Sequence, residues 1–481
     1  MNYYLPQHID SNKIFLINHS DIEGRIDSYF YLPSFKELED KLHEIMCIPL
    51  SRLIYSITNG YDFRDYTDSG TPYLKVANVK QGELDFSKIQ YINFDSSQIS
   101  KKIQLTKGNL LLTRKGTYGN AYSLKETYDF VISSEVFYIE LKQDLINSDY
   151  LEIVLNSSIG QKQFDRNKIG AIMGSLSQEA VKQILIPVLS IDKQQQIVDL
   201  YNVAYRSKQS KDNEAQNLLD SIDDYLLEEL GIKLPDSKQS NKTDIPEWMN
   251  SGNLLVKNGR LFMTELSLIE GGRFDATFSK YNFSLNSTKY DSIPFSSYIK
   301  INPRWNKIPL EDTVVSFIPM EAVNEIYCSI TTKLERLAFE SKGYTQFIEN
   351  DILWAKITPC MQNGKATIAN NMVNGLGFGS TEFHVFRPDY TKLNAQFVLA
   401  LLHLKCLRIN AMMFFGGAAG QQRVGTDFFK NLYIPFPPLE TQEKIAKEIA
   451  NMQTQAQKLR EEALFSLQHA KAEIEQMILG E

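Results

Sequence analysis

The sequence has few of the features that mark a secreted or membrane protein. The longest apolar run, Phe397 to Leu402, is far shorter than the ~20 residues that a transmembrane helix needs. The N-terminus has no basic region followed by an apolar stretch, so no signal peptide is predicted. Only four cysteines are present, all far apart in the sequence, as is typical of a reducing compartment: Cys47, Cys328, Cys360 and Cys406. We therefore expect a cytoplasmic protein without a membrane span.

Motifs of catalysis and metal binding are equally scarce. The six histidines are dispersed, and no His/Cys spacing is typical of a zinc site. The glycine-rich run at 416–420 lacks the Lys-Ser/Thr ending of a phosphate-binding P-loop. Asp389 and Lys392 have no second nearby carboxylate to complete a nuclease metal pair, and Pro437 is not preceded by the Asn or Asp motif of amino-methyltransferases. We predict no catalytic residue and no metal site in this chain.

Composition and charge leave a nucleic-acid partner open. Hydrophobic residues make up 43% and charged residues 23%, which is ordinary for a soluble globular protein. The net charge of −7 is uneven, because residues 1–189 carry −3 and residues 254–437 carry +4, while 190–231 carry −5 and 438–481 carry −3. A nucleic-acid binder usually has a basic face. Net charge neither requires such a face here nor excludes it.

The chain contains an internal repeat. Ile186-Pro187, followed by Ile197, recurs 248 residues later as Ile434-Pro435, followed by Ile445. Weaker matches lie between these in the same order: Ile48-Pro49 with Ile293-Pro294, Gly108-Asn109 with Asn350-Asp351, and Ser134-Glu135 with Thr381-Glu382. Glu23–Asp27 also resembles Gly271–Asp275. Matches in one order indicate two copies of a unit of about 245 residues.

Each copy ends in a long helix. Apolar residues recur at alternating steps of four and three over 190–231 and again over 438–481, which is typical of a coiled-coil seam. Ser190 is a candidate N-cap, and Gly231 and Gly480 are candidate stops. Each helix is ~60 Å long at 1.5 Å per residue. Lys208 and Lys211 interrupt the first seam, and the pairs Asp223-Asp224 and Glu461-Glu462 are expected on solvated outer faces.

The remaining parts of each copy read as α+β domains of about 180 residues. We predict a first head at 1–189, a helix at 190–231, a connector at 232–253, a second head at 254–437 and a helix at 438–481. Short β-prone runs such as Leu110–Thr113 and Phe383–Phe386 precede the helical segments Tyr150–Leu155 and Ala395–Leu404. Because connections between elements are usually short, the helices are expected to pair antiparallel, with the two similar heads separated by this spacer and related by a pseudo-twofold axis.

At the entry to the second long helix, the sequence runs Ile434-Pro435-Phe436-Pro437-Pro438-Leu439-Glu440. Together with the doubled architecture, this motif resembles the specificity subunit of type I restriction–modification enzymes. The first copy, Ile186-Pro187-Val188-Leu189, lacks the two later prolines. Leu110–Gly116 resembles the strand and basic loop of the family, and the second copy departs from it at Ile352–Pro359. The resemblance covers essentially the whole chain.

This resemblance implies a non-enzymatic DNA-binding subunit. Each head would read half of an asymmetric bipartite target in double-stranded DNA, and the helix pair would set the unread gap. The chain would recruit two methyltransferase subunits and the restriction/translocase subunits. It would carry no cofactor itself, with S-adenosylmethionine, ATP and Mg expected on those partners. The alternatives are an orphan or decoy specificity protein and a protein-only coiled-coil scaffold, and an enzyme ranks below both.

Loop residues with the chemistry of base and phosphate recognition are the candidate DNA contacts, because Arg and Lys pair with guanine and phosphate while Asn and Gln pair with adenine. They fall in three clusters: Arg114, Lys115, Tyr118 and Asn120 in head 1; Lys356, Gln362, Asn363 and Lys365 in head 2; and Gln421, Gln422 and Arg423 after the glycine-rich run. Any single one of them is also explained by ordinary turn chemistry. His384, Trp305 and Trp354 are expected to pack in the core.

Overall fold

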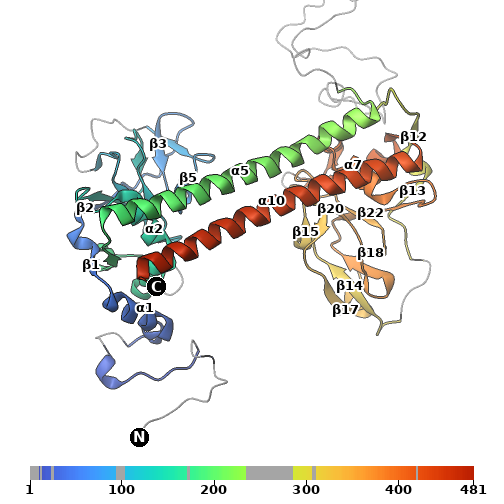
Figure 1. Cartoon of the computed structure of the whole chain (residues 1–481). Helices are drawn as coiled ribbons and strands as arrows, with labels where there is room; N and C mark the ends of the chain where they lie inside the picture. The colour runs from blue at the N-terminus through green and yellow to red at the C-terminus, as the bar shows by residue number, and fades with distance from the viewer. Residues whose placement is uncertain are drawn as a thin grey trace, which may run out of the picture. The chain divides into compact units, whose positions relative to one another are not determined.

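Figure 1 shows the computed structural model of the chain. The chain folds into two compact units. Unit 1 comprises Met1–Lys211 with Glu461–Glu481, and unit 2 comprises Asp212–Arg460. The structure describes residues 10, 13–22, 26–93, 103–170, 174–234, 285–305, 310–418 and 421–480. Most of the predicted connector, the start of head 2 and the Gly271–Asp275 match therefore lie outside the described residues. Each unit contains one head together with a part of both long helices.

The two long helices are α5, Ile191–Leu230, and α10, Leu439–Leu479. Ser190 acts as the N-cap of α5, since its hydroxyl accepts a hydrogen bond from the Lys193 amide at 3.4 Å. Gly231 and Gly480 follow the last helical residues with φ of 63° and 75°. Only glycine adopts this left-handed conformation without a steric cost, so both helices end where the sequence predicts.

Within each unit, the start of one long helix packs against the end of the other. In unit 1, Ile197 of α5 shares a buried core with Ile474 of α10. In unit 2, Leu226 of α5 shares a core with Ile445 of α10. This pairing requires the two helices to run antiparallel, which confirms the prediction.

The central sheet of each head has four antiparallel strands in the same order. In unit 1 the order is β2-β10-β7-β8, and in unit 2 it is β13-β22-β19-β20. The strands of the first sheet are Ile54–Asn59, Val136–Leu141, Leu110–Thr113 and Ala121–Ser123. Those of the second are Ile299–Ile301, Phe383–Pro388, Ile352–Ala355 and Ala366–Ile368. The repeat seen in the sequence is therefore a repeat of topology.

A second sheet completes each head and also has equivalent strands. In unit 1 the order is β6-β3-β9, and in unit 2 it is β17-β14-β21-β18. The strands are Gln90–Ile92, Thr71–Leu74 and Val131–Ile132, and then Leu334–Leu337, Val314–Ile318, Leu376–Gly379 and Thr345–Ile348. In both sheets one pair is parallel, β3 with β9 and β14 with β21. Among the described residues, head 2 has one more edge strand, β18, than head 1.

Short strand pairs join the beginning of each head to its end. Strand β1 (Cys47–Pro49) pairs with β11 (Leu185–Pro187), and Ile48 lies opposite Ile186. Strand β12 (Ser292–Pro294) pairs in the same register with β25 (Tyr433–Pro435). A small hairpin also recurs, formed by Val79–Lys80 with Glu83–Leu84 as β4–β5 and by Val323–Asn324 with Ser329–Ile330 as β15–β16.

Helices cover the sheets, and α7, α8 and α9 of unit 2 correspond in order to α2, α3 and α4 of unit 1. In unit 1 they are α1 (Pro33–Glu44), α2 (Ser148–Asn156), α3 (Ser158–Asn167) and α4 (Gln178–Lys182). In unit 2 they are α7 (Ala395–His403), α8 (Lys405–Met412) and α9 (Thr426–Lys430). Trp354 is 1% exposed in the core of unit 2, and His384 is also buried, as predicted. Trp305 is half-buried and packs on Phe378.

One buried glutamine at the start of each long helix fixes the helix to its own head. The side-chain oxygen of Gln194 accepts a hydrogen bond from the Asn147 amide at 2.9 Å, and its amide donates to the Leu189 carbonyl. Gln442 makes the same contacts with Asn394 and Pro437, also at 2.9 Å. Asn147 and Asn394 are the N-caps of α2 and α7. A buried amide is costly without partners, so these bonds fix the position of each helix entry.

A carboxylate near the end of each long helix binds the other copy's head. Glu475 of α10 accepts hydrogen bonds from the Ser158 amide and hydroxyl, both at 2.7 Å, at the first turn of α3. Asp223 of α5 accepts a hydrogen bond from the Lys405 amide at 2.9 Å, at the first turn of α8. An anion at a helix N-terminus satisfies unpaired N–H groups and opposes the positive end of the dipole.

These contacts correct the expectation of solvated acidic faces for one residue of each pair, while Asp224 and Glu461 are exposed, as predicted. Asp223 is half-buried at the start of α8, and Glu462 pairs with Lys211 at 2.8 Å. Because that pair lies in the helix seam of unit 1, a lysine that interrupts the apolar pattern still has a partner. Sequence spacing places these carboxylates on a helix but does not show which head packs there.

No single helix in the described part of the chain is long and apolar enough to cross a membrane. Helices α7 and α8 reach that length only together, and they are bent by 62° at Leu404. Phe397 and Leu402 of α7 are buried in the core of unit 2. The apolar character of this pair is therefore that of core helices.

Replacing Glu475 with alanine should destabilise unit 1. The change leaves the first turn of α3 without its carboxylate acceptor, and the loss of such a cap costs about 1–2 kcal/mol. Urea unfolding followed by circular dichroism, together with amide hydrogen exchange at Ser158, measures the effect. Glu473→Ala is the matched control, because Glu473 is exposed on the same helix. Equal stability and equal exchange in the two variants would show that the cap does not stabilise the head.

Candidate nucleic-acid interface

The first candidate residue of head 1, Arg114, directly follows the central strand β7. Its amide donates to the Glu135 carbonyl at 2.9 Å, and its own carbonyl accepts from the Leu176 amide at 2.8 Å. The guanidinium lies 5.1 Å from the centre of the Phe137 ring. Its Nε is buried without a hydrogen-bond partner among the described residues. The backbone is therefore fixed on both sides, while the charged group keeps unused donors.

Lys356 occupies the equivalent position in head 2, directly after β19. Its amide donates to the Glu382 carbonyl at 2.9 Å, and its carbonyl accepts from the Val424 amide at 3.0 Å. These are the same two backbone contacts that Arg114 makes. The sequences of the two loops differ, but the structure places a basic side chain at the same point of the same strand. The match of Gly108-Asn109 with Asn350-Asp351, at an offset of 242, aligns the same two residues in the sequence.

The rest of the head 1 cluster divides between exposed and internally bonded residues. Lys115 is exposed beside Gly116, which has a φ of 76°. The hydroxyl of Tyr118 donates to Asp165 at 2.6 Å. Burial raises the pKa of Tyr118, and the hydrogen bond to Asp165 raises it further. The side-chain amide of Asn120 donates to the Val79 carbonyl at 3.0 Å. Tyr118 and Asn120 thus hold the loop, and Lys115 faces solvent.

In head 2, the loop after Lys356 divides in a similar way. Gln362 and Asn363 are exposed in the turn before β20. Lys365 is mostly buried and donates to the Val323 carbonyl at 2.8 Å, and it also pairs with Glu325 at 3.4 Å. Lys365 therefore attaches this loop to the β15–β16 hairpin. The other two side chains are accessible to a ligand.

The third cluster lies beside Lys356. Arg423 begins strand β24 (Arg423–Val424), which pairs with β23 (Phe415–Gly416). Its guanidinium makes two hydrogen bonds to Glu382, both 2.9 Å long, and its side chain is 41% exposed. These hydrogen bonds, together with the positive charge of Arg423, lower the pKa of Glu382. Gln421 is exposed, and the Gln422 carbonyl accepts from the Thr358 amide.

The structure also identifies a residue that loop chemistry alone does not indicate. Glu382 holds Arg423 and, through its backbone carbonyl, also Lys356. Its equivalent in head 1 is Glu135, whose carbonyl holds Arg114. The match of Ser134-Glu135 with Thr381-Glu382 was the available signal. Sequence alone gave that match no role, because the contact joins segments that are far apart in the chain.

His384 lies beneath this cluster as a buried, neutral side chain. Its Nε2 donates to the Val424 carbonyl at 2.8 Å, and its Nδ1 accepts from the Asn302 side-chain amide at 3.1 Å. Burial lowers the pKa of His384 to about 4. The imidazole supports β24 from below and is not placed to meet a ligand.

Among the described residues, no group of three or more His, Cys, Asp or Glu side chains is arranged to hold a metal ion. The candidate clusters hold basic and amide side chains at the ends of central strands. Such an arrangement suits an anionic ligand with hydrogen-bonding edges, which describes duplex DNA.

Comparison with known proteins gives the family. The model of the type I restriction modification DNA specificity domain matches residues 55–218 and again residues 286–463, together well over half of the chain. The chain belongs to this family. The two matches fall on the two copies of the repeat, and each extends from a head into the long helix that follows it.

Individual relatives agree over part of the chain. The EcoEI and EcoAI specificity subunits of type I restriction enzymes from Escherichia coli are 34% and 35% identical over 181 and 182 residues. These stretches cover 37% and 38% of this chain, and the chain spans only about 30% of each relative.

A solved structure from work on the assembly and conformational transition of the type I R-M system is similar in fold, with a TM-score of 0.51 and 13% identity. That similarity covers 90% of this chain and 97% of the other.

Acidification should destabilise unit 2 through His384. The folded pKa of about 4 lies below the ordinary value of 6.5, so protons bind the unfolded chain more readily, and stability falls as pH drops from 6.5 towards 4. The contribution is on the order of 2–3 kcal/mol. His384→Gln keeps a donor for the Val424 carbonyl and should flatten this pH dependence. Urea unfolding at pH 7 and pH 5 measures this change in stability. An equal loss of stability between the two pH values in His384→Gln and in the wild-type chain would show that His384 is not its cause.

Proposed function

We propose that this chain is the DNA sequence-specificity subunit of a type I restriction–modification complex. Head 1 and head 2 each read one half of an asymmetric bipartite target, and the antiparallel helices set the unread gap. The chain is the non-catalytic member of the complex. It recruits two methyltransferase subunits and the restriction/translocase subunits, which supply S-adenosylmethionine, ATP and Mg chemistry.

One observation supports this proposal most strongly. Arg114 and Lys356 have identical backbone contacts at the same strand end of two heads with the same topology. Their surroundings differ, since the carboxylate-bound Arg423 lies opposite Ile357, the residue after Lys356, whereas Ser175 lies opposite Lys115, the residue after Arg114. An equivalent position with different neighbours in the two heads is the arrangement expected of two readers of different half-sites. Base discrimination then comes from the variable side chains around a common anchor.

Membership of the family and the doubled heads favour this function over the alternatives. An orphan or decoy specificity protein would bind DNA without forming an active complex, and a scaffold would bind no DNA. The geometry gives the scaffold no support, because the strand-end cations are more readily explained by a phosphate or a base edge than by helix packing. We place the protein in the cytoplasm with its DNA target.

Substitution of the two anchors should affect different half-sites. Selection from a random duplex pool with the full-length chain should enrich two short motifs at a fixed spacing. Arg114→Ala should reduce the preference for one motif and Lys356→Ala for the other, each by about 1–3 kcal/mol if the side chain contacts a base. Lys193→Ala and Lys447→Ala, at exposed lysines on the long helices, serve as controls.

The pattern of loss distinguishes the roles. If an anchor contacts only phosphate, its loss weakens binding to all sequences alike and lowers the salt dependence. Selection of no motif by the wild-type chain would contradict the proposal. Loss of both motifs in either variant would contradict the assignment of one half-site to each head.

A further inference from the structure

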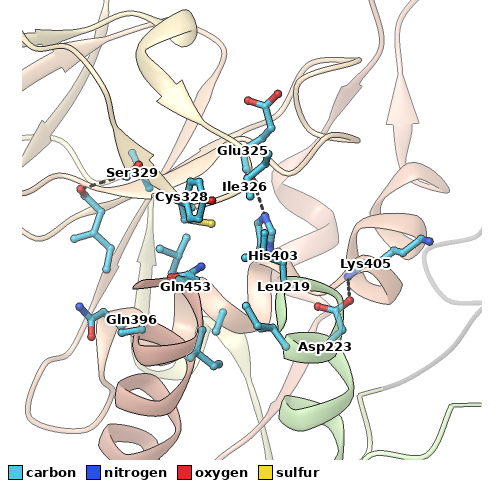
Figure 2. A pocket seen from close by; sticks show the side chains of 18 of the residues that line it. Leu219, Asp223, Glu325, Ile326, Cys328, Ser329, Gln396, His403, Lys405 and Gln453 are labelled. Atoms are coloured by element: carbon cyan, nitrogen blue, oxygen red, sulfur yellow. Dashed lines mark hydrogen bonds between the residues drawn. The ribbon is translucent and has the colours of Figure 1, made fainter. Parts of the chain in front are cut away.

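Unit 2 contains a hollow of about 950 Å³ at the junction of head 2 and its helices. Figure 2 shows the turn of the β15–β16 hairpin, with Glu325 and Cys328, facing Leu219 of α5 and Gln453 of α10. The volume lies near the upper end of the range of pockets that bind organic ligands. His403 fixes the turn of this hairpin, because its Nε2 donates a hydrogen bond to the Glu325 carbonyl at 2.9 Å.

The hollow combines an apolar floor with a polar rim. Leu399 of α7 and Ile449 of α10 form part of the floor. The amide side chains of Gln453, Gln396 and Asn370 also line the hollow, together with charged side chains that include Asp220, Lys333 and Arg408. This lining suits a flat apolar group that carries a hydrogen-bonding end.

The equivalent space in head 1 is filled by the chain itself. The offset of 248 that relates Gln194 to Gln442 places Tyr201 opposite Ile449, and Tyr205 opposite Gln453. The rings of the two tyrosines are stacked, with centroids 6.0 Å apart and planes inclined by 13°. The Tyr205 hydroxyl donates to Glu83 at 3.5 Å. Both rings therefore reach the β4–β5 hairpin from α5.

One further position in the lining differs between the heads, because a large polar side chain in head 1 is replaced by an apolar one in head 2. Glu152 of α2 corresponds to Leu399 of α7, counted from the N-caps Asn147 and Asn394. Glu152 pairs with Lys125 at 3.1 Å in head 1. A β-carbon added at Gly82 would lie 3.2 Å from the Glu152 carboxylate and 3.3 Å from the Tyr201 hydroxyl. Head 1 is thus closely packed where head 2 is hollow.

The hairpin itself also differs. In head 1 two residues, 81–82, separate strands β4 and β5, whereas in head 2 four residues, 325–328, separate β15 and β16. The Tyr327 hydroxyl accepts a hydrogen bond from Arg460 of α10 at 3.3 Å. The longer turn therefore extends to the helix and forms one wall of the hollow.

We propose that this hollow binds a tyrosine side chain of a partner polypeptide, taking the place that Tyr201 and Tyr205 fill in head 1. A phenol has the apolar ring that the floor accepts and a hydroxyl that the amide rim can bond. The two heads then differ in how they meet partners, and this conclusion does not depend on the proposed DNA function.

The test uses the full-length chain and N-acetyl-tyrosinamide, which reproduces a tyrosine residue. Saturation-transfer NMR should show binding to the wild-type chain in the millimolar range. Ile449→Tyr with Gln453→Tyr introduces the residues of head 1 and should weaken binding at least about tenfold. Gln455→Tyr is the matched control, since Gln455 is exposed on the same helix and should leave binding unchanged. N-acetyl-leucinamide, which has no ring, should not compete.

One further variant guards against misfolding. Ala450→Phe adds one ring from another position in the lining and should also abolish binding, while circular dichroism and thermal melting verify the fold of each variant. Saturation transfer that is absent from the wild-type chain would overturn the proposal. Equal binding by the wild-type chain and by a folded variant with a filled hollow, or equal competition by the leucine analogue, would overturn it as well.

Discussion

The contact between each head and the end of the other copy's long helix is the constraint on which the structure depends. Glu475 binds the first turn of α3 in unit 1, and Asp223 binds the first turn of α8 in unit 2. Around these carboxylates, Ile474 and Leu226 enter the cores of the same heads. Each head therefore rests on two helices, its own through a buried glutamine and the other copy's through a carboxylate. Neither copy forms this arrangement from its own segment alone.

This exchange explains why the two compact units do not coincide with the two sequence copies. Unit 1 takes in residues 461–481 of the second copy, and unit 2 takes in residues 212–231 of the first. Antiparallel pairing brings these ends to the correct heads. The predicted division at residues 189, 231, 253 and 437 remains a description of the sequence repeat. The compact units follow the packing instead.

The sequence was sufficient for the long helices, for several of the strands and for the repeat, because these depend on local pattern. The apolar seam, the capping residue Ser190 and the stop at Gly231 define the first long helix. The β-prone run Leu110–Thr113 is strand β7 without any shift of its ends. The role of Asp223 was beyond such reasoning, since an acidic residue on a helix has the same pattern whether it faces water or a helix N-terminus. Only the tertiary contact distinguishes the two.

The candidate interface shows the same limit. Sequence chemistry selected Arg114 and Lys356 separately, from loops that do not resemble each other. The match of Gly108-Asn109 with Asn350-Asp351 aligns the two residues, and the carbonyls of Glu135 and Glu382 show that both backbones are fixed alike. The same chemistry also selected Asn120 and Lys365, whose side chains bind backbone carbonyls of neighbouring hairpins. A polar residue in a loop can bind a ligand or hold the loop, and composition does not distinguish these roles.

The central claim is that two different heads read one gapped DNA target for a methylating complex. The most direct test is the genome-wide pattern of adenine methylation in the host, with and without the gene for this chain. The account predicts that one bipartite motif, with two unlike halves at a fixed spacing, loses methylation when the gene is removed and regains it when the gene is restored. An unchanged methylation pattern would contradict the claim.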